Sequence, residues 1–305
     1  MTRMFDSPDA HKFTPDSLEA GSDPFALADP LGESRYRVTP RLIHQYSNRA
    51  LLKTTGRCFG YCRFCFRRAW IATNQDFIDE AELASVLAYL REHPGIREIL
   101  ISGGDPLTET NDRLDILFAA LREARPGIVL RVCTRAPAAN PARLTDDSIA
   151  LFRRWRPLRV AAHINHPKEL GGLAGERLAA CVDAGIPVHI QTVLLRGIND
   201  DAAILAELFQ KCLNLGLTPY YLFQLDLAPG AAHFRVPLKQ GLAIYAELKS
   251  LVSGLALPKY AVDLPGGGGK ITLHEGAIAG EEYRPEGRVC LLKGPDGKLW
   301  PYPAD

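Results

Sequence analysis

The sequence of 305 residues predicts an α/β fold, a partial (β/α)6 barrel with short extensions at both ends. Two patterns predict this fold. Short runs rich in β-branched residues, typical of buried strands, alternate with longer segments whose apolar residues recur at helical spacing. Such alternation favours parallel strands joined by right-handed helical crossovers, which can curl a sheet. Six repeats are fewer than the eight of a closed barrel, so a partial barrel fits best.

The expected elements follow one another regularly along the chain. The predicted strands are 51–55, 98–102, 128–134, 158–164, 188–195, 219–224 and 260–264. The predicted helices are 79–92, 111–124, 145–155, 173–184, 201–215 and 238–252. Residues 1–40, rich in Pro, Asp and Ser, are expected to form an N-terminal extension, residues 41–275 the barrel, and residues 276–305 a short C-terminal extension.

Charge and composition favour a small-molecule enzyme. The 36 Lys and Arg residues nearly balance the 35 Asp and Glu residues, so no nucleic-acid or membrane surface is expected as a partner. The chain has no basic start followed by an apolar run, and no apolar stretch of about 18 residues. We therefore expect a cytoplasmic protein.

Three cysteines lie within eight residues, Cys58, Cys62 and Cys65 in RCFGYCRFC. This spacing predicts a loop whose three thiolates bind one four-iron four-sulfur cluster and leave the fourth iron open for chemistry. Chance clustering and half of a zinc site are the alternatives, although a structural zinc site normally has four ligands. The run resembles the radical S-adenosylmethionine (SAM) signature. The four other cysteines are expected to be reduced thiols.

Chemically active side chains follow the predicted strands. In α/β barrels the carboxyl ends of the strands and the loops after them line the active site. The glycine pair in SGGDP could expose backbone to a ligand that a Cβ would exclude, although this motif is also typical of a tight turn. A lone histidine at such a position is often structural. The residues at these ends are Gly103, Gly104, Asp105, Thr134, Arg135, His163, His166, Gln191, Asp226, Asp263 and Lys270.

The glycine run 266–269 in VDLPGGGGKI is followed directly by Lys270. A backbone of this kind can approach a flat ligand closely, and a partly desolvated lysine can form a Schiff base with pyridoxal 5′-phosphate (PLP). Glycine-rich loops ending in lysine also bind phosphate in nucleotide-binding folds. This one lacks the GxxxxGK[ST] pattern, because Ile271 stands at the hydroxyl position.

Asp226 and Asp263 each end an apolar strand, in QLDL and AVDL. A carboxylate facing a closed pocket needs a cation to offset its desolvation, and two carboxylates can bind one ammonium group. Either acid alone could instead cap a loop or pair with an arginine. Together they favour a substrate with a distal positive charge.

Taken in order, these motifs resemble the lysine 2,3-aminomutase family of PLP-dependent radical SAM enzymes. The resemblance covers about residues 44–275 and includes CFGYCRFCFRR, SGGDPL, CTRAP, HINHPKEL, QTVLLRGIND, YYLFQLDLAPGAAHFR and VDLPGGGGKI. It implies a barrel of the radical SAM type with a cluster on the three cysteines. It further implies PLP on Lys270 with Tyr46 and Arg49 near its phosphate, SAM near Gly103, Gly104, Asp105, His163 and Gln191, the substrate carboxylate on Arg67, and its distal ammonium on Asp226 and Asp263.

The resemblance also implies a reaction, an isomerisation that moves the 2-amino group of L-lysine to C3 and gives β-lysine. An electron donor such as flavodoxin or ferredoxin would be a partner, and a homo-oligomer is expected to be possible. Three alternatives stay open: another cationic substrate such as arginine or ornithine, a β-lysine-forming role in the modification of translation elongation factor P, and a non-catalytic or cluster-only protein.

Three features depart from the family pattern. The cysteine-rich tail that helps to bind zinc in larger members is missing, so we expect no zinc. Gln45 stands where an arginine is usual near the PLP phosphate, in HQY instead of HRY. Phe223 stands where a tyrosine is common. The two substitutions are expected to alter PLP affinity unless a neighbouring basic group compensates.

Overall fold

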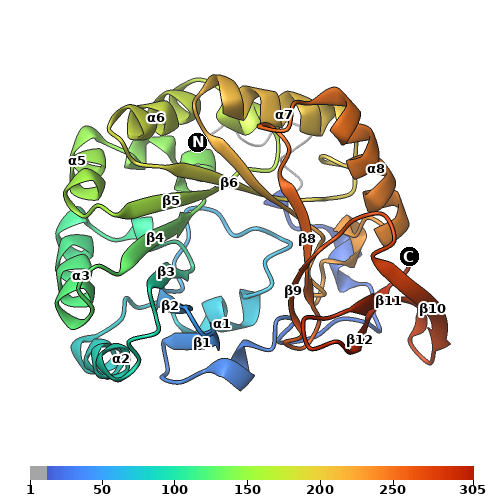
Figure 1. The fold of residues 1–305 in the computed structure, drawn as a ribbon, viewed down its shortest axis with the longest axis horizontal. Coiled ribbons are helices and arrows are strands. Elements are labelled where there is room, and N and C mark those ends of the chain that lie inside the picture. Colours follow the sequence, from blue (N-terminus) through green and yellow to red (C-terminus); the bar gives the residue numbers. More distant parts are fainter. Residues whose placement is uncertain (1–11) are drawn as a thin grey trace.

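A curved, open sheet of nine strands forms the centre of the protein, in the computed structural model that describes residues 12–305. Strand order in the sheet follows the chain from β1 to β9. Strands β2 to β8 are parallel, whereas β1 and β9 pair antiparallel at the two edges. The predicted partial barrel is therefore confirmed, and helices α2, α3 and α5–α8 lie along the outer rim of the curve, whereas α1 lies inside it (Figure 1).

The elements have the following bounds. The strands of the main sheet are β1 Leu42–Tyr46, β2 Arg49–Thr55, β3 Glu98–Gly103, β4 Val129–Thr134, β5 Leu158–His163, β6 Val188–Val193, β7 Thr218–Phe223, β8 Lys259–Leu264 and β9 Gly269–Thr272. The helices are α1 Arg68–Thr73, α2 Glu80–Glu92, α3 Asn111–Ala124, α4 Ala136–Ala139, α5 Asp146–Arg154, α6 Leu173–Asp183, α7 Ala202–Asn214 and α8 Leu238–Leu251. A separate antiparallel sheet contains β10 Ile278–Arg284, β11 Gly287–Lys293 and β12 Leu299–Pro303.

The predicted strands correspond to β2–β8 and the predicted helices to α2, α3 and α5–α8, each end lying within two residues of its expected place. Side-chain caps fix where several helices begin. Asp79 forms a capping box with Glu82 at α2, and Asp201 accepts hydrogen bonds from the first turn of α7. No helix within residues 12–305 combines the length and the apolar character that crossing a membrane requires.

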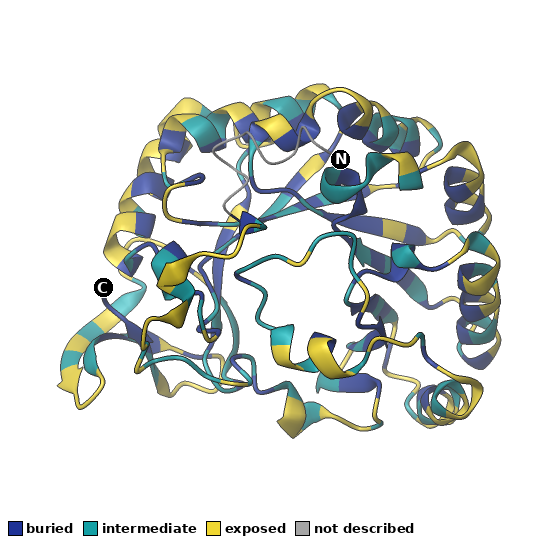
Figure 2. Ribbon diagram, turned by 180° about the vertical axis from the view of Figure 1, so that it is seen from behind, coloured by how far each residue is buried: buried dark blue, intermediate teal, exposed yellow. Residues whose placement is uncertain are grey.

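The two faces of the main sheet have different surroundings. Along β4, Leu130, Val132 and Thr134 are buried beneath the helices, whereas the alternating Arg131 and Cys133 are only partly buried and line the concave side. Side chains on a strand alternate between faces, so one side builds the core and the other is left for a cavity. Figure 2 shows the buried strands inside a rim of helices whose outer sides are exposed.

Both extensions pack against the barrel. On the N-terminal side, the Leu27 amide donates to the carbonyl of Leu227, and Pro30 accepts from the Gly266 amide. The first eleven residues of the predicted extension lie outside the described part of the chain. The C-terminal sheet sits at one end of the arc, beside β8 and β9 (Figure 1).

A buried hydrogen-bond network ties the C-terminal sheet to the end of β7. Tyr302 in β12 donates to the carbonyl of Leu225 at 2.6 Å and accepts from Gln224 Nε2 at 3.2 Å. Gln224 in turn accepts from the hydroxyl of Tyr260 at 2.5 Å. Because Leu225 precedes Asp226, this network fixes the backbone from which a predicted site residue projects.

Removing the Tyr302 hydroxyl should destabilise the fold. Tyr302→Phe leaves the buried Leu225 carbonyl without this donor and removes one of the two bonds that Gln224 Nε2 donates, and an unsatisfied buried group typically costs about 1–3 kcal/mol. We expect this loss in the free energy of unfolding, measured by urea denaturation. The matched control is Tyr283→Phe, because Tyr283 is 86% exposed and should tolerate the change. Equal stability of the two variants would contradict the role given to the network.

Candidate active site

The concave side of the sheet encloses a cavity of about 850 Å³. Strands β2 to β8 contribute its walls, and the cysteine loop after β2 lies within the curve (Figure 1). Each residue that the sequence predicted for cofactor or substrate binding lines this one cavity. They are Tyr46, Arg49, Cys58, Cys62, Cys65, Arg67, Gly103, Gly104, Asp105, His163, Gln191, Asp226, Asp263 and Lys270. The structure therefore brings them together, while the role of each stays a prediction.

The cysteine loop turns tightly, with the Cys65 amide donating to the carbonyl of Cys62 at 3.1 Å. Burial raises the pKa of Cys58 and of Cys62, and raises that of Cys65 to about 11. Within residues 12–305, no three His, Cys, Asp or Glu side chains lie close enough to form a closed metal site. The donor set nevertheless fits iron, because three thiols on one loop are the soft ligands that iron–sulfur clusters use, and metal binding releases their protons.

The SGGDP turn packs directly against the backbone of the cysteine loop. Gly103 has a φ of +118°, and a Cβ there would lie 2.5 Å from the carbonyl oxygen of Thr55. A Cβ on Gly104 would meet the carbonyl of Arg57. The glycines are thus required by the protein's own chain, a reason that the sequence did not reveal. The buried Asp105 carboxylate accepts bonds from Thr134 Oγ1 and from the Arg135 amide, both at 2.8 Å.

His163, the last residue of β5, is a direct neighbour of Gln191, which pairs with it in register two residues before the end of β6. His163 Nε2 lies 3.1 Å from Asn165 Oδ1, and the His163 ring packs edge-on against Phe64. Burial, reinforced by the positive charge of Arg135, lowers the pKa of His163 to about 3. The ring is therefore neutral at physiological pH, and because Nε2 donates to Asn165 Oδ1, Nδ1 is left as an acceptor for a ligand.

Lys270 directly follows the glycine run and is the second residue of β9, so it lies on a strand. The run makes a turn between β8 and β9, and this hairpin places Lys270 directly opposite Asp263. Lys270 Nζ lies 2.5 Å from Asp263 Oδ2 and 4.0 Å from the centre of the Phe223 ring. Tyr46 accepts a hydrogen bond from the Lys270 amide at 3.2 Å, and Arg49 stacks on the Tyr46 ring.

Asp226 lies near this ion pair. Burial, together with the negative charge of Asp263, raises the pKa of Asp226 to about 8. Within residues 12–305 its carboxylate has no hydrogen bond or ion pair of its own. Two carboxyl groups near a single lysine ammonium can accept a further positive charge, which would favour the ionised form of Asp226.

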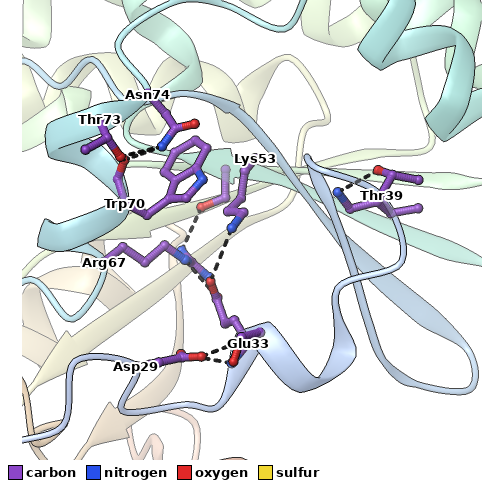
Figure 3. Close-up of polar contacts among 11 residues, drawn as sticks. Asp29, Glu33, Thr39, Lys53, Arg67, Trp70, Thr73 and Asn74 are labelled. Carbon is purple, nitrogen blue, oxygen red and sulfur yellow. Dashed lines mark hydrogen bonds and ion pairs between the residues drawn. The ribbon is translucent and has the colours of Figure 1, made fainter.

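Three residues that the sequence analysis did not select surround Arg67 (Figure 3). Glu33 Oε1 accepts from Arg67 Nε at 2.9 Å and from Nη2 at 2.6 Å. Arg67 Nη1 donates to Ser102 Oγ at 3.3 Å, and Lys53 Nζ lies 3.9 Å from Glu33 Oε2. In the sequence, Glu33 is simply an acidic residue in the run DPLGE, and the segment around it has neither strand nor helix periodicity.

Comparison with known proteins identifies the class. Residues 52–209 match the Radical SAM superfamily. A radical SAM methyltransferase from Sphaerobacter thermophilus has the same fold, with a TM-score of 0.52 and 17% identity, over 72% of this chain and 68% of that chain. The partial barrel with its cysteine loop is therefore that of a radical SAM protein.

The chain belongs, within that class, to the lysine 2,3-aminomutase family. It is 49% identical over 90% of its length to a Treponema pallidum (strain Nichols) protein provisionally named L-lysine 2,3-aminomutase, of which it covers 78%. It is 36% identical over 84% of its length to the L-lysine 2,3-aminomutase of Clostridium subterminale, and 34% identical over 80% to the glutamate 2,3-aminomutase of Clostridioides difficile (strain 630). It spans only 62% and 58% of those two proteins. Family membership indicates an isomerase and implies a four-iron four-sulfur cluster, SAM and PLP.

Asp226 should make stability depend on pH. Its pKa of about 8 in the folded protein exceeds the value of about 3.9 for an unfolded chain. The folded state therefore holds a proton that the unfolded state releases, and the stability from this proton is full below about pH 4 and is lost as pH rises to about 8. We expect Asp226→Asn, which has no such proton, to gain stability relative to the parent as pH rises through this range.

The measurement is urea unfolding of the cofactor-free protein at a series of pH values. Asp183→Asn is a suitable control, because Asp183 is exposed at the end of α6. A stability difference between parent and Asp226→Asn that stays constant from about pH 5 to about pH 8 would contradict the raised pKa.

Proposed function

We propose that the protein is a PLP-dependent radical SAM aminomutase that moves the 2-amino group of L-lysine to C3. The observation that carries this proposal is the grouping of charges in one cavity. Arg67 is a cation suited to the substrate carboxylate, and the paired acids Asp226 and Asp263 are suited to the distal ammonium. The cysteine loop and Lys270 line the same cavity.

Two cofactor sites support the proposal. Cys58, Cys62 and Cys65 would hold the cluster, and Lys270 would carry PLP through its amine. When bound, the cluster and SAM supply the radical that takes hydrogen from C3, and PLP supplies a conjugated system that lets the nitrogen migrate. The chain's own contribution is to bind, orient and exclude water.

The surroundings of Lys270 suit a flat ligand. Its Nζ lies 4.0 Å from the ring centre of Phe223 and 5.2 Å from that of Tyr221, so aromatic faces border the place where PLP would attach. Tyr46 and Arg49 lie next to the Lys270 backbone and are the proposed phosphate contacts. Arg131 also lines the cavity and is a basic group that could offset Gln45, although Glu98 pairs with it here.

The ion pair between Lys270 and Asp263 favours a cationic substrate. If the amine of Lys270 is bonded to PLP, Asp263 loses the ammonium that now faces it at 2.5 Å. A buried carboxylate without a cation is costly, so the distal ammonium of lysine would restore the balance. The side-chain carboxylate of glutamate would place a further negative charge beside Asp263, whose charge already raises the pKa of Asp226.

Other members of the substrate class meet the same charge requirement. Arginine and ornithine carry a distal cation, and a β-lysine-forming role in elongation factor P modification uses the same chemistry. One relative, from Clostridioides difficile, is named glutamate 2,3-aminomutase. Asp226 and Asp263 nevertheless disfavour glutamate as a substrate of this chain. A flavodoxin or ferredoxin is the proposed electron donor.

The proposal is tested by anaerobic turnover. Protein reconstituted with iron, sulfide, SAM and PLP is incubated with lysine, arginine, ornithine or glutamate, and the α and β isomers are separated. We expect β-lysine from L-lysine and no β-glutamate, because two carboxylates face the distal group. Robust glutamate isomerisation, or no isomerisation of any cationic amino acid, would contradict the proposal.

A variant that lacks one of the two acids tests the proposed substrate pocket more directly. Asp263→Asn should lower lysine turnover by orders of magnitude, since breaking a buried ion pair typically costs about 3–5 kcal/mol. The exposed Asp183→Asn is the matched control and should keep parental turnover. Normal lysine turnover by an Asp226 and Asp263 double variant would rule out the proposed pocket.

PLP attachment should depend on Lys270. We expect borohydride to fix PLP to Lys270 in the parent, because this amine lies inside the cavity against two aromatic rings. Peptide mapping by mass spectrometry identifies the modified residue, and Lys270→Ala should lose the visible absorption of bound PLP. Lys259→Ala serves as the control, because Lys259 is exposed at the start of β8. PLP fixed to a different lysine would contradict the assignment.

A further inference from the structure

A short N-terminal segment, Asp29–Tyr36, crosses the open side of the barrel and contacts two parts of the site. We call it the N-terminal strap. Asp29 accepts hydrogen bonds from the amides of Glu33 and Ser34, both at 2.9 Å, and so holds the single 3-10 turn Glu33–Tyr36 in shape. Figure 3 shows Asp29 below Glu33, and Glu33 directed upward to Arg67 and Lys53.

The strap is also fixed to the glycine turn that precedes Lys270. Pro30 accepts from the Gly266 amide at 2.7 Å, Arg35 Nη1 donates to the Gly266 carbonyl at 2.7 Å, and the Tyr36 hydroxyl donates to Gly267 at 2.8 Å. A Cβ on Gly32 would lie 2.7 Å from the Gly266 carbonyl, so the approach requires glycine. The position of Glu33 is thus set by the same structure that carries Lys270.

Glu33 divides the hydrogen-bonding capacity of Arg67. A guanidinium has five N–H donors, and a planar edge of two parallel donors binds one carboxylate. Glu33 occupies the edge formed by Nε and Nη2, and Ser102 accepts one further bond from Nη1. Among the described residues, these contacts use three of the five donors, so one donor on each Nη nitrogen is left for a second carboxylate.

The charges around Arg67 also favour a substrate carboxylate at this place. Arg67 and Lys53 are two cations with side chains only 13% and 6% exposed, and both lie against Glu33, which is 13% exposed. Trp70 packs over Lys53, with Nζ 4.6 Å from its ring centre. Arg67, Lys53 and Glu33 together carry one net positive charge, which one substrate carboxylate would balance. Without Glu33, two poorly solvated cations would face each other.

We propose that Glu33 is a positioning residue for substrate recognition, which holds Arg67 so that its two remaining donors bind the α-carboxylate of the amino acid. This inference rests on the proposed function, because it assigns Arg67 to the substrate. Glu33 acts through Arg67 and does not itself touch the substrate. The strap therefore links the carboxylate-binding arginine to the turn that bears Lys270.

The test compares each amino acid with the amine that lacks its carboxylate. Protein with its cluster, SAM and PLP, kept without reductant so that no turnover occurs, is titrated calorimetrically with lysine and 1,5-diaminopentane. Ornithine with 1,4-diaminobutane and arginine with agmatine are the further pairs. The ratio of the two dissociation constants in each pair isolates what the carboxylate contributes to binding.

We expect the parent to prefer the amino acid in at least one pair, and Glu33→Gln to lose about tenfold or more of that preference while it binds the amine as the parent does. Glu282→Gln is the matched control, because the Glu282 side chain on β10 is 42% exposed and pairs only with Arg284 among the described residues. Circular dichroism checks the fold of each variant. If Glu33→Gln does not fold, Asp29→Ala loosens the strap and should lower the same ratio.

Three results would overturn the inference. Equal losses for amino acid and amine would make Glu33 merely structural, and a gain in amino-acid affinity would make it a competitor for Arg67. A parent with no carboxylate preference in any pair would remove Arg67 from substrate binding. A parent that binds lysine through its carboxylate but forms no β-lysine would contradict the proposed function and leave the role of Glu33 intact.

Discussion

The ion pair between Lys270 and Asp263 is the interaction on which the site depends. It exists because β8 and β9 form a hairpin in which the two residues face each other, so an ammonium and a carboxylate meet at 2.5 Å inside a cavity. Its presence leaves Asp226 as a second acid whose burial raises its pKa. A reaction that takes the Lys270 amine away from Asp263 must supply another cation, and an amino acid with a second amino group would do so.

The same requirement for charge balance applies at the proposed site for the substrate carboxylate. Arg67 and Lys53 both pair with Glu33, and one more carboxylate would complete the balance. The fold makes both arrangements possible because parallel strands end at one edge of the sheet and their loops converge there. The concave face is a cavity instead of a packed core, since the sheet stays open between β1 and β9.

The sequence predicted β2–β8 and the outer helices well, because period-two and helical apolar patterns are strong in buried, repeated units. It missed the edge strand β1, and it missed β9, a strand of four residues that begins with the last of the four glycines. Strands β10–β12 were missed as well, since their burial is irregular and many of their residues are exposed. Cysteine spacing and strand-end chemistry identified the cavity residues. Glu33 could not be found this way, because its partner Arg67 lies 34 residues away and no pattern joins them.

The most direct measurement is an anaerobic crystal structure of the reconstituted protein with SAM, PLP and L-lysine. We expect a cluster on Cys58, Cys62 and Cys65, and PLP next to Lys270 with its aldehyde carbon on the 2-amino nitrogen of the substrate in place of the Lys270 amine. We further expect the lysine carboxylate on Arg67 and the distal ammonium between Asp226 and Asp263. Lysine bound with its carboxylate away from Arg67, or with its distal ammonium away from both acids, would contradict this prediction.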